Sequence, residues 1–237
     1  MTGKTNAFAD GTSRRDVMKL TGMGAVGLLA SAAAGPTHAQ VAPRNTLREL
    51  NGFDQTPASL SNATLILVDY QNTYTRGVME LDGWEPALKS AAQLLSNARA
   101  AGAKVIHIVN DGGEGTPYDT RAEIGQIHPS VAPIEGEPVV VKKVPNGFVD
   151  TDLGEKVDAA GNKNVIIVGF MTNMCVTFTT EGAFLRGNHP TVVADACATR
   201  PIRTTVGDVS ASELHKSALA TITDLYGVVV KSASALK

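Results

Sequence analysis

A cysteine that follows a buried strand is the strongest chemical signal in this sequence. The apolar run Val165–Val168 closes at Gly169, as expected of a strand buried on both faces of a parallel sheet, and Cys175 comes six residues later. The residues beyond Cys175 have the apolar spacing of a helix. A thiol near a helix N-terminus has a lowered pKa and favours the nucleophilic thiolate. From these residues alone, a buried and inert cysteine is an equally good interpretation.

Polar or charged residues follow three other apolar runs that have the character of strands. They are Asp69 after residues 64–68, Asn110 and Asp111 after residues 104–109, and Lys142 after residues 138–141. In a parallel sheet, ligands bind outside the carboxyl ends of the strands, so these groups and Cys175 are predicted to meet at one edge. The long segment 111–137 has no clear periodicity and is predicted to form a pocket wall there.

The elements that must position these groups alternate between strand and helix. Two further strands are predicted over residues 191–194 and 228–230. Helical spacing runs over residues 86–101, a short helix is predicted from about Asp152, and Ser210 with Glu213 forms a capping box for a helix that should stop at Gly227. This order predicts a doubly wound α/β fold, with a six-stranded, mostly parallel sheet and helices on both faces.

The first residues indicate export rather than part of the fold. Residues 13–19 carry a twin-arginine pattern, and the apolar run 20–34 is too short for a confident membrane span. A small-residue cleavage site ends at Ala39. We therefore expect a signal peptide over residues 1–39, a single domain over residues 40–237, recognition by the twin-arginine export machinery, and a periplasmic or secreted product without a membrane segment.

Charge and cysteine usage narrow the class of partner. Removing residues 1–39 takes away four of the 21 basic and two of the 23 acidic residues, which leaves 17 against 21. No basic cluster interleaved with aromatics occurs, so neither nucleic acid nor an anionic membrane is an expected partner. Although an exported protein can form disulfides, Cys197 ends an apolar run and is interpreted as a packed core thiol rather than a partner of Cys175.

Three motifs in order give the chain a resemblance to a known family. Residues 67–74 read Leu-Val-Asp-Tyr-Gln-Asn-Thr-Tyr, residues 141–148 read Val-Lys-Lys-Val-Pro-Asn-Gly-Phe, and residues 169–176 read Gly-Phe-Met-Thr-Asn-Met-Cys-Val. Together they resemble the isochorismatase-like cysteine hydrolases, over nearly the whole chain after residue 39. The resemblance implies a Rossmann-like six-stranded parallel sheet and a catalytic set of Asp69, Lys142 and Cys175. Lys142 is chosen over Lys143 because it lies six residues before Phe148, as the family's lysine precedes its motif phenylalanine.

The resemblance also implies a mechanism. Cys175 forms a thioester with the substrate, Asp69 acts as general acid and base, and Lys142 is their electrostatic partner. The backbone N–H groups of Met171 and Cys175 form the oxyanion hole, and the peptide bond from Phe170 to Met171 is cis. Weaker candidates for the substrate pocket are Tyr74, Tyr118 and Phe178.

Some residues depart from branches of the family. The nicotinamidase branch binds a metal through an Asp-x-His element, whereas Asp111 is followed here by two glycines and a glutamate. No metal and no cofactor are therefore expected, and His107, inside a strand, is interpreted as a hydrogen-bonded core residue. Asn173 stands where many relatives have histidine, which affects contacts near the thiol.

The predicted function is hydrolysis of a C–N bond in a small amide or carbamoyl compound by an exported amidase-like enzyme. One alternative is the hydrolysis of a vinyl ether, the isochorismatase reaction, in which Asp69 supplies the proton and Cys175 is dispensable. A second alternative is a redox or binding protein without turnover on the same fold. By analogy with the family, a homo-oligomer is expected. The sequence does not identify the substrate.

Overall fold

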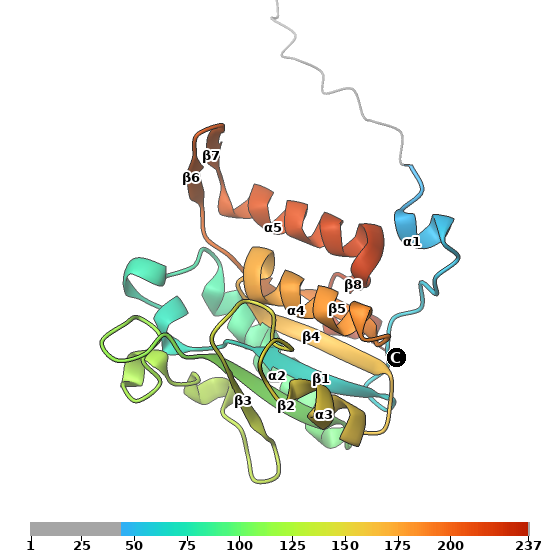
Figure 1. Ribbon diagram of the computed structural model, residues 1–237, viewed down its shortest axis with the longest axis horizontal. Coiled ribbons are helices and arrows are strands. Elements are labelled where there is room, and N and C mark those ends of the chain that lie inside the picture. The colour runs from blue at the N-terminus through green and yellow to red at the C-terminus, as the bar shows by residue number, and fades with distance from the viewer. Residues whose placement is uncertain (1–43, 237) are drawn as a thin grey trace, which may run out of the picture. The chain divides into compact units, whose positions relative to one another are not determined.

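The computed structural model describes residues 44–236, and a six-stranded sheet forms its centre (Figure 1). The strands are β1 (Ala63–Val68), β2 (Lys104–Asn110), β3 (Val139–Lys142), β4 (Asn164–Phe170), β5 (His189–Ala198) and β8 (Val228–Val230). They pair in the order β3-β2-β1-β4-β5-β8, and every pair is parallel. All six predicted strands and the doubly wound α/β fold are thus confirmed. The predicted signal peptide and its cleavage site at Ala39 lie outside the described residues.

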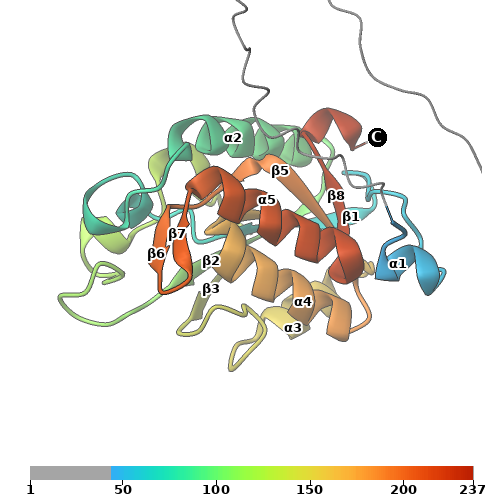
Figure 2. The same cartoon turned by 90° about the horizontal axis from the view of Figure 1, so that it is seen from above.

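Helices cover both faces of the sheet. They are α1 (Leu47–Leu50), α2 (Trp84–Ala100), α3 (Leu153–Ala159), α4 (Thr177–Leu185) and α5 (Ala211–Thr221). Figures 1 and 2 show α2 on one face and α3 and α4 on the other, with α5 beside α4. The predicted capping box of Ser210 and Glu213 opens α5, which continues as a π-helical turn and stops before Gly227. Within residues 44–236, no helix has both the length and the apolar character needed to span a bilayer.

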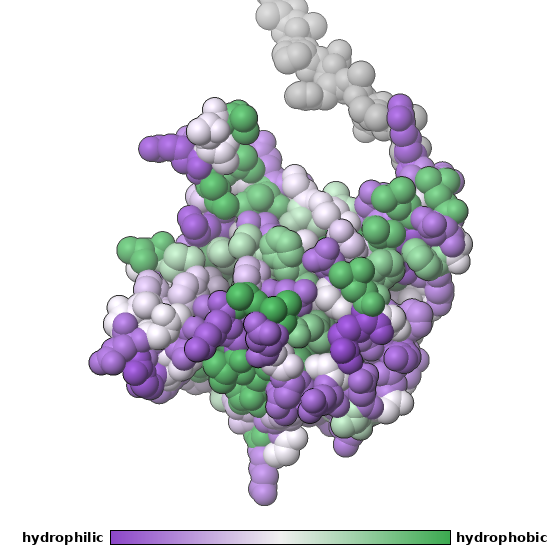
Figure 3. All heavy atoms as spheres, in the orientation of Figure 1, coloured by the Kyte–Doolittle hydropathy of each residue, from purple (hydrophilic) through white to green (hydrophobic). Residues whose placement is uncertain are grey.

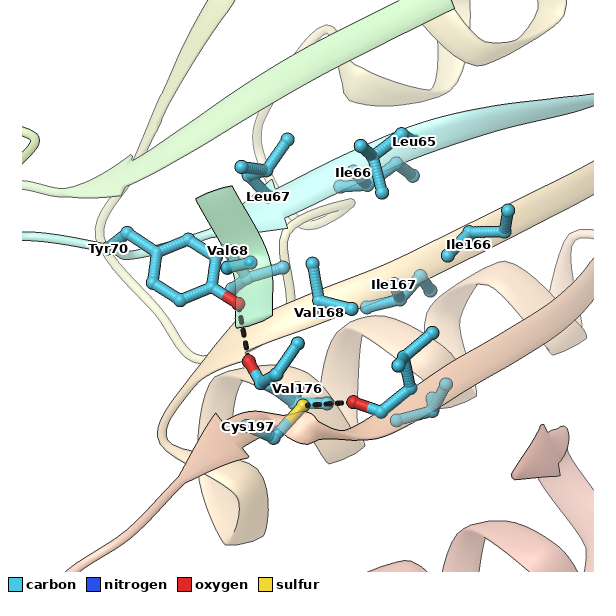
Figure 4. Close-up of a cluster of buried hydrophobic side chains, with 14 of the residues drawn as sticks. Leu65, Ile66, Leu67, Val68, Tyr70, Ile166, Ile167, Val168, Val176 and Cys197 are labelled. Atoms are coloured by element: carbon cyan, nitrogen blue, oxygen red, sulfur yellow. Dashed lines mark hydrogen bonds between the residues drawn. The ribbon is translucent and has the colours of Figure 1, made fainter. Parts of the chain in front are cut away.

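The sheet core explains why the central strands have continuous apolar runs. Every residue of β1 is buried, and in β4 only Asn164 is not, because helices pack on both faces. Figure 4 shows this cluster, in which the Tyr70 hydroxyl donates to the Ala196 carbonyl. The Tyr70 ring packs edge-on against Phe170 at 4.7 Å between ring centres. Each large aliphatic side chain buried in this core contributes about 1.5–3 kcal/mol to the stability of the fold.

The two central strands approach each other closely where the chain order reverses. Gly169 of β4 pairs with Val68 of β1, and it has a positive φ of 152°. A Cβ atom at this position would lie 2.0 Å from the Val68 carbonyl oxygen. Glycine is therefore required at Gly169, and it allows the ends of β1 and β4 to meet at the point where doubly wound sheets bind ligands.

Strand β5 is longer than predicted. It was predicted over residues 191–194, with Cys197 near its end, whereas the strand runs from His189 to Ala198. The register shifts between Ile167, which pairs with Val192, and Gly169, which pairs with Cys197. Asp195 falls within this irregularity and its side chain is exposed, so a charged residue is accommodated without ending the strand.

A hairpin that the sequence analysis did not predict follows β5. It consists of β6 (Ile202–Thr204) and β7 (Gly207–Val209), which pair antiparallel. Figure 1 shows it projecting from the rest of the domain. Val206 in its turn is 94% exposed, and Figure 3 shows apolar atoms at the end of this projection.

Short 3₁₀ turns occupy several connections. They span Asn72–Tyr74, Gly77–Met79, Glu123–Gly125, Pro129–Val131 and Ala233–Ala235. The long segment 111–137 contains two of them and lies against the residues that follow β1. The Asn72 N–H donates to the Gln126 carbonyl at 3.0 Å, and the His128 N–H donates to the Tyr70 carbonyl at 2.8 Å. The segment therefore packs at the carboxyl edge of the sheet, where a pocket wall was predicted.

Candidate active site

A carboxylate, an ammonium and a thiol meet at the carboxyl edge of the sheet. Lys142 Nζ lies 2.7 Å from Asp69 Oδ2 and donates to Cys175 Sγ at 3.3 Å. The exposed fraction is 0% for Asp69, 1% for Lys142 and 7% for Cys175. The structure thus brings together the three side chains predicted to be catalytic, and Lys142 contacts both of the others.

The local backbone directs each of these side chains inward. Asp69 directly follows β1 and has a positive φ of 51°, a conformation that aspartate tolerates better than most residues. Its N–H donates to the Ile108 carbonyl of β2 at 2.9 Å. Lys142 ends β3, where alternation buries it and leaves Val141 and Lys143 exposed. The choice of Lys142 over Lys143 therefore agrees with the burial of the two side chains.

On the side of β2, Asn110 contacts the Lys142 ammonium and is itself held by Gln71. Lys142 Nζ also donates to Asn110 Oδ1 at 3.3 Å. The fully buried Gln71 accepts from the Asn110 N–H at 2.9 Å and donates to the Asn110 and Gly125 carbonyls at 2.9 and 2.6 Å. Gln71 belongs to the motif of residues 67–74, and no role was predicted for it. Since it joins residues far apart in the chain, only the fold reveals that role.

The site's electrostatics correct one expectation. Burial raises the pKa of Cys175, and the Asp69 carboxylate raises it further, against the opposing effect of Lys142. The predicted lowering at a helix N-terminus was therefore wrong for the resting protein. Cys175 lies within a π-helical turn, Thr172–Val176, that precedes α4, and it is almost completely desolvated. The resting site holds a thiol beside an ion pair.

Opposing effects act on the pKa values of both members of the ion pair, Asp69 and Lys142. Burial raises the pKa of Asp69, while Lys142 lowers it. Burial works to lower the pKa of Lys142, but the negative charge of Asp69 and the hydrogen bonds to Asp69 and Cys175 outweigh it, so the pKa is raised. A carboxyl group whose pKa is raised is a better proton acceptor, which suits it to receive the thiol proton.

The turn that carries Cys175 begins at a cis peptide bond between Phe170 and Met171, as the resemblance implied. The Met171 carbonyl accepts hydrogen bonds from the N–H groups of Met174 at 3.1 Å and Val176 at 3.2 Å, rather than from Cys175. This spacing leaves the Cys175 N–H outside the hydrogen bonds of that carbonyl. Of the predicted oxyanion donors, Met171 thus directly precedes the turn and Cys175 lies within it.

Two of the three predicted pocket residues, Tyr74 and Tyr118, lie near Asp69 and Cys175. The ring of the buried Tyr74 packs edge-on against Tyr118 and against Phe170, each at 5.8 Å between ring centres. Burial is the main cause that raises the pKa of both tyrosine hydroxyls, and the negative charge of Asp69 adds to it. Phe178 is different, because it is 39% exposed on α4 and takes no part in these aromatic contacts.

Three other predicted residues have structural partners. Asn173 Oδ1 accepts from the Thr199 hydroxyl at 2.6 Å, which ties the catalytic turn to the end of β5. His107 is 1% exposed and its Nε2 lies 3.0 Å from Glu137 Oε2, which confirms a hydrogen-bonded core histidine. Cys197 is a free, buried thiol, and burial raises its pKa to about 12. It is the packed core residue that was predicted.

Known proteins are similar to this chain both in sequence and in fold. A protein named secreted isochorismatase effector Isc1, from Verticillium dahliae, is 33% identical over 189 residues, which cover 79% of this chain and 97% of that protein. Ureidoacrylate amidohydrolase RutB of Stutzerimonas stutzeri is 29% identical over 172 residues, covering 57% of this chain and 69% of that protein. An isochorismatase structure from Pseudomonas putida KT2440 has a TM-score of 0.79 and 34% identity, covering 82% of this chain and 100% of that chain. A family model described as the isochorismatase domain matches residues 63–234. The chain therefore belongs to the isochorismatase family, as the motifs predicted.

Proposed function

We propose that this protein, a hydrolase by its family, cleaves a C–N bond of a small amide or carbamoyl compound through a thioester on Cys175. The observation that carries the proposal is the position of Lys142 Nζ, 2.7 Å from the Asp69 carboxylate and 3.3 Å from the Cys175 sulfur. A buried ammonium between these groups stabilises the negative charge wherever it resides, on the carboxylate or on the sulfur. A relative named as an amidohydrolase supports the same reaction class.

The first half of the reaction transfers the acyl group to sulfur. The Cys175 thiol gives its proton to the Asp69 carboxylate as Sγ bonds to the substrate carbonyl carbon, and the carbonyl oxygen becomes negative. The backbone N–H groups of Met171 and Cys175 donate to that oxygen. When the tetrahedral intermediate collapses, the C–N bond breaks and the nitrogen takes the proton from Asp69, which leaves a thioester and a free amine or ammonia.

The second half repeats the proton transfers with water. Asp69 accepts a proton from a water molecule as the water oxygen attacks the thioester carbon. The C–S bond then breaks. The sulfur recovers the proton from Asp69, and the carboxylic or carbamic acid product leaves. Throughout, Lys142 remains an ammonium, so its role is electrostatic, and no metal or cofactor enters these steps.

Export is part of the proposal. The twin-arginine pattern of residues 13–19 and the small residues before Gln40 are the features that support a cleaved signal peptide and a periplasmic or secreted enzyme. One relative has a name that describes it as secreted. Fractionation of cells that express the full chain, with Arg14 and Arg15 both changed to lysine as the comparison, tests this location.

A thiol-specific experiment tests the chemistry. With a panel of primary amides, carbamoyl compounds and isochorismate, we expect Cys175→Ala to lower kcat on the best amide by more than about a thousandfold. Cys197→Ala is the matched control, since it removes the other buried thiol, which lies outside the reacting groups. Mass spectrometry of the wild-type protein during turnover should detect an acyl adduct on the peptide that contains Cys175.

The same panel separates the alternatives. Full amide turnover by Cys175→Ala would exclude the thioester. Hydrolysis of isochorismate that survives in Cys175→Ala but is lost in Asp69→Asn would instead indicate the vinyl-ether reaction, in which the carboxyl group alone supplies the proton.

A further inference from the structure

A histidine of α5 is hydrogen-bonded to the first residue of the turn that carries Cys175. His215 Nδ1 lies 2.9 Å from the hydroxyl oxygen of Thr172. Thr172 opens the π-helical turn and directly follows Met171, whose N–H is one of the two proposed oxyanion donors. The hydrogen bond therefore joins a separate helix to the backbone that must bind the substrate oxygen.

The Thr172 hydroxyl is the donor in this hydrogen bond. Thr172 is 0% exposed, and within residues 44–236 its hydroxyl has no other hydrogen-bond partner. A buried hydroxyl proton needs an acceptor, and the imidazole of His215 offers one at Nδ1 when its own proton is on Nε2. Burial lowers the pKa of the half-buried His215, which favours this neutral form. His215 thus fixes the Thr172 side chain as its acceptor.

Hydrogen bonds within the turn fix its shape, whereas bonds from other elements fix its position. Within the turn and the first residue of α4, the Thr172 carbonyl accepts from the Thr177 hydroxyl at 2.6 Å. From outside, the Thr199 hydroxyl after β5 donates to Asn173, and His215 of α5 accepts from Thr172. The start of the turn is therefore held between β5 and α5, and loss of the bond to α5 frees it on one side.

We propose that His215 is a positioning residue for acyl transfer, which acts through Thr172 to hold the Met171 N–H where it donates to the developing oxyanion. This inference rests on the proposed function and adds a residue to it. An oxyanion donor must lie close to hydrogen-bond distance from the oxygen in the transition state, and removing one such donor lowers kcat by about a hundred- to a thousandfold. A displaced donor should lose part of that effect.

Two substitutions of nearly equal shape test the acceptor. Asparagine places an amide oxygen close to the position of imidazole Nδ1, whereas leucine has no acceptor. On the best amide, His215→Leu should lower kcat by about 10- to 100-fold and leave KM within about threefold, because the donor acts on the transition state. His215→Asn should stay within about threefold of wild type. Lys216→Leu is the control, since it places leucine at an exposed position of the same helix, and circular dichroism checks that each variant is folded.

Removing the hydroxyl tests the same bond from the other side. Thr172→Val keeps the branched shape of threonine, and it should lower kcat to about the same extent as His215→Leu. Because both substitutions break one bond, the double variant should be no slower than the slower single variant, within about threefold. Losses that multiply would show that the two residues act separately, and they would overturn the inference.

Acylation by para-nitrophenyl acetate separates this inference from the proposed function, because it requires no C–N cleavage. Cys175 Sγ bonds to the acetyl carbon, the thiol proton passes to Asp69, the ester C–O bond breaks, and nitrophenolate leaves. The absorbance of nitrophenolate gives the rate, and mass spectrometry locates the acetyl group on Cys175. Acetylation that is at least about tenfold slower in His215→Leu, but not in His215→Asn, supports the inference even if no amide is hydrolysed.

Two results would overturn the inference and leave the proposed function intact. One is acetylation and amide hydrolysis by His215→Leu at the wild-type rates. The other is an equal loss in His215→Leu and His215→Asn, which would indicate that the shape of the imidazole matters and its acceptor does not. A wild-type protein that is not acetylated on Cys175 and hydrolyses no amide would overturn both proposals.

Discussion

Replacing Lys142 by methionine isolates the energetic role of the buried ion pair. Methionine is close to lysine in length and apolar volume but has no charge, so the substitution removes the ammonium with little change in packing. It leaves the Asp69 carboxylate in a site where its side chain is 0% exposed and its other oxygen, Oδ1, has no hydrogen-bond partner among residues 44–236. The variant therefore measures what an uncompensated buried carboxylate costs.

The expected loss is large. Breaking a buried ion pair by removing one partner typically costs about 3–5 kcal/mol, because the remaining charge stays desolvated. Removing both charges costs much less, since no ion is then left without a partner. We therefore expect Lys142→Met to lower the free energy of unfolding at pH 7 by about 3–5 kcal/mol, and Lys142→Met/Asp69→Asn to recover at least about 2 kcal/mol of that loss.

The pH dependence has a defined sign. Without Lys142, burial is the largest effect on Asp69, opposed by a hydrogen bond with Cys175, and it holds the pKa of the folded state above the 3.8 of an unperturbed aspartate. A group whose pKa is raised by folding contributes most stability below its unfolded pKa and loses it as pH rises through the folded pKa. The deficit of Lys142→Met relative to the double variant should thus be small near pH 4 and grow towards pH 8.

Urea denaturation followed by fluorescence and circular dichroism measures these free energies at each pH. Lys143→Met is the matched control, because the neighbouring lysine is exposed, and it should change stability by less than about 0.5 kcal/mol. A loss below about 1 kcal/mol in Lys142→Met, or a double variant no more stable than the single one, would refute the buried ion pair.

Two further predictions concern stability away from the thiol. Gly169→Ala should lower the free energy of unfolding by more than about 2 kcal/mol in urea denaturation, because the new Cβ meets the Val68 carbonyl oxygen at 2.0 Å and φ is positive; wild-type stability would contradict the close approach. Although burial acts to raise the pKa of Glu137, hydrogen bonds from Arg99 and His107 lower it from 4.5 to about 2. A lowered pKa stabilises the fold above the unfolded value and is lost as pH falls, so Glu137→Gln should cost about 3 kcal/mol at pH 7 and little near pH 2; a deficit independent of pH would contradict this.

Much of the fold could be predicted because its signals are local. Continuous apolar runs identified the six strands, and the residues at their carboxyl ends identified Asp69, Lys142 and Cys175 as neighbours before any coordinates. Alternation along β3 places Lys142 and Lys143 on opposite faces, and the spacing of the motif to Phe148 selected Lys142, which is the buried one. These inferences need only the period of a strand and the rule that parallel strands end at one edge.

The features that were missed depend on distant segments. The full length of β5 was not predicted, because Asp195 interrupts the apolar residues and only the pairing with β4 shows that one strand passes through it. The direction of the Cys175 pKa was wrong for a similar reason. A helix N-terminus is visible in the sequence, whereas the burial of the thiol and its proximity to Asp69 arise from the packing of separate strands.

The carboxyl ends and the amino ends of the strands hold different kinds of polar group. At the carboxyl edge lie the groups assigned to chemistry and substrate binding, whereas Glu137, which precedes β3, joins Arg99 and His107 near the opposite end of that strand. Because the strands separate these sets, substitutions that strengthen the Glu137 network need not disturb the reacting atoms. Substitutions meant to raise stability should therefore be made at the amino ends of the strands, and substitutions meant to alter substrate selectivity at the carboxyl ends.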